Sequence, residues 1–138
     1  MQAPLFSTFS AIAEIFVTAA VFYIVVNNFQ AKGLAWRLAA GVVVFEFSVN
    51  MLYMISRLRA EASSGEATGP MALFAAGHGL LSLIVFIALV VFVFQAYQAW
   101  KRGDFYFRDH PTLTYVFLFF WTVSVVTGEV LYVVRYLV

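Results

Sequence analysis

The chain has 138 residues, of which 64% are hydrophobic and only 11% charged, and its net charge is +1. A soluble domain of this length needs far more polar surface, so the composition excludes that class and predicts a single integral membrane domain over residues 1–138. The absence of cysteine excludes disulfides, iron–sulfur clusters and thiolate metal sites, and the scattered basic residues give no indication of nucleic-acid binding.

The first two predicted spans each contain one carboxylate. Residues 5–29 form a span that we expect to be retained, because the segment lacks a basic leader and is too long for a signal-peptide core. This span carries Glu14, and the second span, residues 35–57, carries Glu46. The polar residues that share a helical face with these acids are Ser10, Thr18, Asn50, Tyr53 and Arg57. The polar interval 59–70 is expected to be a loop.

The third and fourth predicted spans also contain one buried ionisable candidate each. Residues 71–100 would form a helix of ~45 Å, more than a ~30 Å hydrocarbon layer requires, and within it lies His78. An ionisable side chain inside a span costs free energy, so His78 is a functional-site candidate. After a loop at residues 101–111 with aromatic and basic residues typical of the headgroup level, residues 112–138 form the fourth span, with Glu129.

Four spans joined by short loops predict an all-α, antiparallel four-helix transmembrane bundle with up-down-up-down topology. The loops after the first and third spans hold Lys32, Arg37, Lys101, Arg102 and Arg108. The opposite end holds Arg57, Arg59 and Arg135. The excess of positive charge therefore predicts that the first and third loops lie in the cytoplasm and both termini lie outside.

The four ionisable groups are predicted to meet in the outer half of the bundle. Counted from the outer helix ends, their depths are ~13 Å for Glu14, ~16 Å for Glu46, ~10 Å for His78 and ~13 Å for Glu129. In a dry interior such acids repel one another unless protons or a cation compensate. Three carboxylates and an imidazole suit iron, manganese or zinc, so all four residues are candidate metal ligands, although the Glu-x-x-His pairs of soluble di-iron bundles are missing.

Copper or heme would use a different set of residues. Thioethers favour Cu(I), and methionine can be an axial heme ligand, so His78 with Met51 or Met54 is a candidate cofactor-binding set. A heme between His78 and His110 is opposed by the topology, because these residues begin antiparallel helices and should lie ~25–30 Å apart.

Two further interpretations stay open. The buried carboxylates could carry protons, as in a proton-coupled small transporter, although the four spans show no broken helix or inverted repeat, which a homo-oligomer could supply. Alternatively, each acid could bond to a neighbouring polar side chain and only fix how the helices pack, as in a non-catalytic structural subunit of a membrane complex.

The second half of the chain resembles the bacterial four-span family catalogued as domain of unknown function 420. The residues that carry the resemblance are His78, Lys101, Arg102, Arg108, Asp109, His110, Trp121, Thr122, Thr127, Gly128 and Tyr132. The layout of Arg37, Tyr53 and Arg57 in the second span is also similar, so that about two-thirds of the length is covered. The resemblance implies a multi-pass protein of the bacterial inner membrane with a role in heme-copper oxidase maturation, and His78 and His110 match family histidines.

These observations together predict a membrane accessory protein that binds a metal ion (copper, iron or zinc) or heme in the outer half of the bundle. His78 is the central ligand, with Glu14, Glu46 and Glu129 as ligands or charge partners. Its expected partners are the lipid bilayer and a respiratory oxidase or another membrane subunit. Whether it is itself an enzyme is left open by the sequence.

Overall fold

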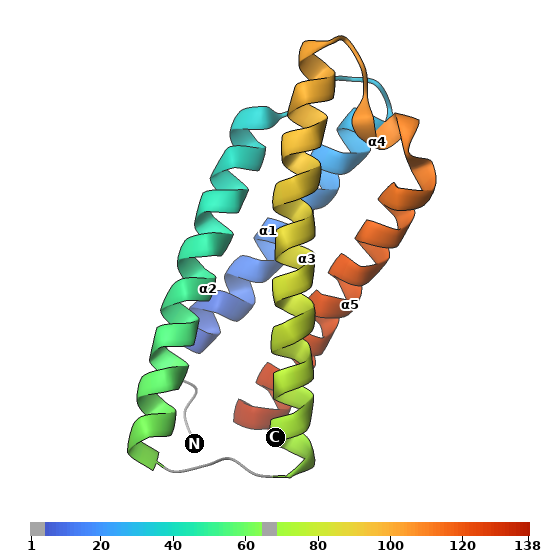
Figure 1. Ribbon diagram of the computed structural model, residues 1–138. Coiled ribbons are helices and arrows are strands. Elements are labelled where there is room, and N and C mark those ends of the chain that lie inside the picture. The colour runs from blue at the N-terminus through green and yellow to red at the C-terminus, as the bar shows by residue number, and fades with distance from the viewer. Residues whose placement is uncertain (1–4, 65–68) are drawn as a thin grey trace.

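The computed structural model describes residues 5–64 and 69–138 (Figure 1). Its four long helices are α1 (Leu5–Phe29), α2 (Trp36–Ser64), α3 (Pro70–Lys101) and α5 (Pro111–Tyr136), and a short helix α4 (Tyr106–Asp109) precedes α5. The side chains of residues 57–64 are not described, so the face expected for Arg57 and the end of the bundle expected for Arg59 lie outside the described residues.

Four segments are long and apolar enough to cross a membrane, namely Leu5–Phe29, Trp36–Ser56, Pro70–Lys101 and Pro111–Tyr136. The predicted all-α architecture with four long membrane helices is therefore confirmed, and the chain is a multi-pass helical membrane protein. Many large apolar side chains on these helices point away from the protein interior, among them Phe16, Leu73 and Phe119. In a bilayer these side chains contact lipid.

Helix boundaries follow from glycine and proline. Pro70 occupies the first turn of α3, where its missing N–H costs nothing, and Gly69 before it has φ 106°. Gly103, with φ 82°, lies just beyond the end of α3, and Pro111 begins α5. The loop expected at residues 59–70 is shorter than predicted, because α2 continues through the helix-favouring Arg, Ala and Glu residues to Ser64.

The helices form a ring in the order α1, α2, α3, α5, in which each packs against the next and α5 closes against α1. The start of α1 and the end of α5 lie at one end of this ring, and α4 lies at the other end (Figure 1). The direction therefore alternates from one long helix to the next, as expected for short connections.

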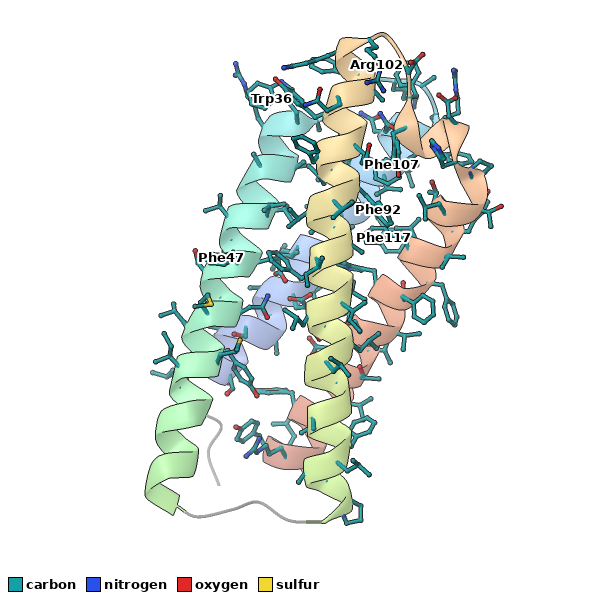
Figure 2. All side chains as sticks on the ribbon, viewed as in Figure 1. Trp36, Phe47, Phe92, Arg102, Phe107 and Phe117 are labelled. Carbon is teal, nitrogen blue, oxygen red and sulfur yellow. The ribbon has the colours of Figure 1, made fainter. Side chains whose placement is uncertain are left out.

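The apolar core occupies the half of the bundle that is nearer α4. Its buried members include Val21, Ile24, Leu89, Phe107 and Phe117. Figure 2 shows Phe92, Phe107 and Phe117 between α3 and α5, where the rings of Phe92 and Phe117 meet edge to face at 5.3 Å. The other half of the bundle, in which α1 begins and α5 ends, contains a cavity.

Candidate ligand-binding cavity

A cavity of about 640 Å³ occupies the half of the bundle in which α1 begins and α5 ends. All four long helices line it. On α3 the lining runs from Met71 at the helix start to Phe86, a distance of about 22 Å at 1.5 Å per residue. Space is available because the α3 wall is built from small residues, namely Ala72, Ala75, Ala76 and Gly79. The cavity therefore extends from the end of the bundle to about its middle.

Two carboxyl groups lie at the inner end of this cavity, which we call its floor. Glu14 is the innermost lining residue of α1, and Glu46 is the innermost lining residue of α2. The floor is completed by apolar and aromatic side chains, Val85 and Phe86 of α3 and Trp121 of α5. The two acids therefore face a cavity whose adjoining surface is mostly apolar.

The carboxyl groups of Glu14 and Glu46 are close enough for a side-chain hydrogen bond between them. Such a bond requires a proton on one of the two, because ionised carboxylates only accept. Glu46 is 7% exposed, and its Oε1 atom is buried without a hydrogen-bond partner among the described residues. The buried Oγ atom of Ser10 also has no partner among them. A buried acceptor without a donor costs free energy, so this pair is open to a proton or a cationic ligand.

The nearest polar group, Asn50, is also within hydrogen-bond reach of the Glu46 carboxyl group, but it carries no charge. Asn50 donates its Nδ2 to the backbone carbonyl oxygen of Glu46, at 2.8 Å. Glu129, half-buried on α5, adds a third acid that repels Glu14 electrostatically. Arg135 lines the cavity near the end of α5, but it is exposed and its guanidinium lies 5.8 Å from the ring centre of Tyr136. The inner cavity is therefore acidic.

His78 also lines the cavity, but both of its ring nitrogens have partners. Its Nδ1 lies 2.8 Å from Oγ1 of Thr127, and its Nε2 lies 3.3 Å from Oγ of Ser82. Because the Thr127 hydroxyl donates to the carbonyl oxygen of Ser124, it must accept from His78, which assigns a proton to Nδ1. The Ser82 hydroxyl is in turn 2.9 Å from that of Ser124. His78 thus connects α3 to α5 through a chain of hydroxyl groups.

Gly128 explains how the imidazole of His78 fits between these helices. A Cβ atom at this position would lie 2.9 Å from Cε1 and 3.2 Å from Nε2 of His78. The ring edge that carries Nε2 therefore packs against the backbone of α5. Coordination of a metal or heme iron through Nε2 would require displacement of Ser82 and movement of the ring.

The donor arrangement does not form a ready metal centre. Among residues 5–64 and 69–138, no group of three or more His, Asp and Glu side chains is close enough to hold one metal ion. The four candidate ligands, Glu14, Glu46, His78 and Glu129, line the same cavity, yet they do not converge on a common point. Metal binding by these residues stays a prediction.

The remaining sequence candidates lie away from the cavity lining. Met51 and Met54 are 43% and 53% exposed on α2, and neither contributes to the cavity wall. His110 lies beside α4 at the other end of the bundle, where its ring packs on Tyr106 at 4.5 Å and its Nδ1 is 2.8 Å from the Tyr106 carbonyl oxygen. Nothing in this arrangement supports a heme held by His78 with either methionine.

Several residues that shape the cavity were not predicted to act together. The hydroxyls of Ser82, Ser124 and Thr127 surround His78, and the four-residue spacing from His78 to Ser82 was the available signal for one of them. Thr18, which shares a face with Glu14, instead accepts a hydrogen bond from the indole N–H of Trp121, at 3.3 Å. The approach of Gly128 to the imidazole had no signal within a single helix.

Comparison with known proteins adds no relative. No family model matches the chain, and neither the curated proteins nor the solved structures contain a match. The resemblance to the four-span family is therefore not supported by these comparisons and stays a prediction.

Proposed function

We propose that this chain is a membrane-embedded binding protein for a small organic cation. The observation that carries the proposal is the Glu14–Glu46 pair at the cavity floor, with a buried Oε1 atom that no described donor reaches. When the site is empty, a proton shared between the two carboxyl groups relieves their repulsion. A bound ammonium group replaces this proton and supplies donors to the unpaired oxygen.

The size and lining of the cavity favour an organic cation over a bare ion. Its volume of about 640 Å³ falls within the ~300–1,000 Å³ of small-molecule pockets. Aromatic side chains, including Phe86, Trp121 and Tyr132, lie along the same walls. Apolar walls with a few convergent charged groups are typical of sites for small organic ligands, and aromatic faces attract ammonium groups.

Titration of the purified protein in lipid nanodiscs with benzylammonium tests this proposal by calorimetry. The wild type should bind the cation more tightly than neutral benzyl alcohol, because only the cation can form an ion pair with the carboxylates. Glu14→Gln and Glu46→Gln should each weaken binding by about tenfold or more, which corresponds to ~1.4 kcal/mol.

The matched control is Asp104→Asn, which removes an exposed acid that lies 4.0 Å from Arg102 and outside the cavity lining. This variant should bind benzylammonium like the wild type. Equal binding of benzyl alcohol and benzylammonium, or unchanged binding in Glu46→Gln, would contradict the proposal.

The second candidate function is copper or heme handling linked to heme-copper oxidase biogenesis. The observation that favours it is the presence of His78 and all three glutamates in one cavity. With the termini outside, as the basic loops predict, that cavity would open on the outer side of the bacterial inner membrane. Elemental analysis and an absorption spectrum of purified protein test it, and a Soret band that is lost in His78→Ala would favour heme.

A transporter and a structural subunit would each behave differently in the titration with benzylammonium. A proton-coupled transporter would move the cation across vesicles in response to a pH gradient, and not merely bind it. A purely structural subunit would lose its fold in Glu14→Gln or Glu46→Gln and would bind no cation in the wild type.

A further inference from the structure

An apolar groove lies on the outer side of the seam between α2 and α3. Its volume is about 450 Å³, and its lining is wholly apolar: Val43, Val44 and Phe47 of α2, and Phe86, Ile87, Val90 and Val91 of α3. Three of these side chains, Val44, Phe47 and Ile87, are more than half exposed, so the groove faces the hydrocarbon of the bilayer. Phe47 is labelled on α2 in Figure 2.

The groove lies at the level of the cavity floor. Glu46 faces the cavity, while Val44 and Phe47 beside it on α2 line the groove. On α3 a single side chain, Phe86, contributes to both the groove and the cavity. Phe86 therefore borders both the lipid-facing groove and the cavity that holds the Glu14–Glu46 pair.

We propose that the ligand of the cavity is an amphiphilic organic cation taken from the bilayer, with its charged end at the Glu14–Glu46 pair and its apolar chain in the α2–α3 groove. This inference rests on the proposed function. Phe86 separates the two compartments when the site is empty and moves aside for the chain, since aromatic side chains change rotamer far faster than helices move.

The two ends of the cavity favour this orientation of the ligand. Towards the termini the lining contains Ser7, Asn50 and Arg135, so an apolar chain placed there would cover polar groups. In the groove the chain meets only apolar side chains and remains continuous with the hydrocarbon of the bilayer. The charged end, in contrast, is costly anywhere at this depth except beside a carboxylate.

Substitutions in the groove distinguish the contribution of the ligand's apolar chain to binding from that of its charged end. Val90→Trp fills the groove, and we expect it to weaken dodecylammonium binding by about tenfold or more while benzylammonium binding is unchanged. Binding of dodecylammonium is measured in nanodiscs by displacement of benzylammonium, with empty nanodiscs as the background. Phe86→Ala, which widens the passage, should speed association of dodecylammonium relative to the wild type.

The matched control is Val130→Trp on α5, which is 46% exposed and outside the groove lining. It should alter binding of neither cation. Unchanged dodecylammonium binding in Val90→Trp, or equal weakening of both cations, overturns the inference while the proposed function stands. If the wild type binds neither cation, the proposed function itself fails.

Discussion

At the scale of single residues, the half-buried His78 and the buried Glu46 differ in whether their polar atoms have hydrogen-bond partners. The Thr127 hydroxyl contacts Nδ1 of His78 and the Ser82 hydroxyl contacts Nε2. In contrast, Oε1 of Glu46 has no hydrogen-bond partner among the described residues. A satisfied buried group stabilises a helix contact, and an unsatisfied one is a candidate binding group. The sequence predicts His78 as the central ligand with Glu46 as a partner, whereas in the structure Glu46 is the group that is more open to a ligand.

Gly128→Ala should loosen the contact between α3 and α5. The added methyl group would lie 2.9 Å from Cε1 of His78, whose ring is held by two hydroxyls and must shift. We expect a loss of ~1–3 kcal/mol in the free energy of unfolding, as for other overpacked sites. Gly79→Ala is the control in a membrane helix, because nothing lies within 4 Å of its added Cβ. Denaturant unfolding in detergent measures both, and equal stability of the two variants would contradict the described His78 contact.

At the scale of elements, one amide ties the first loop and α4 to α1. Asn28 is fully buried, its Oδ1 accepts from the backbone N–H of Phe107 at 3.0 Å, and its Nδ2 donates to the carbonyl oxygen of Gly33 at 3.4 Å. Loops need such partners because their own backbone groups are not paired within a helix. This contact explains why α4 folds against the bundle although the sequence predicted only a loop there.

Asn28→Ala should therefore destabilise the α4 end of the bundle. It leaves the buried N–H of Phe107 without its acceptor, which typically costs ~1–3 kcal/mol. Asn27→Ala, at the half-buried neighbouring position, is the control and should cost less. Hydrogen exchange at the Phe107 amide is the most direct readout, and protection that persists in Asn28→Ala would contradict this role.

The long helices could be predicted from sequence, but the cavity between them could not. The span at residues 5–29 coincides with α1, because apolar length alone determines a membrane helix. The position of Glu14 and Glu46 on cavity-facing sides also agrees with their polar faces. The cavity volume, in contrast, depends on how the small residues of α3 are placed relative to the neighbouring helices α2 and α5, and no pattern within one helix predicts that placement.

At the scale of the whole molecule, the two halves of the bundle are built differently. The half near α4 has an apolar core around Phe107, and the half near the termini holds the acidic cavity. Rigid packing at one end can hold the carboxyl pair in place while the other end stays open to a ligand. The molecule thus combines a closed end with a binding end.

The orientation of this asymmetric bundle can be measured directly because the chain has no cysteine. The basic residues near α4 predict that this end faces the cytoplasm. A single Asp104→Cys variant should then react with an impermeant maleimide only after cells are opened, and Leu137→Cys should react in intact cells. The reverse pattern would place the cavity on the cytoplasmic side.

Proton release on cation binding is the most direct test of the carboxyl pair. Benzylammonium is added to the protein in weakly buffered solution near neutral pH, and the released protons are counted against bound ligand. The account predicts release of up to about one proton per cation, because the proton that Glu14 and Glu46 share in the empty site is displaced. Glu46→Gln should release none. Cation binding without proton release in the wild type would contradict the account.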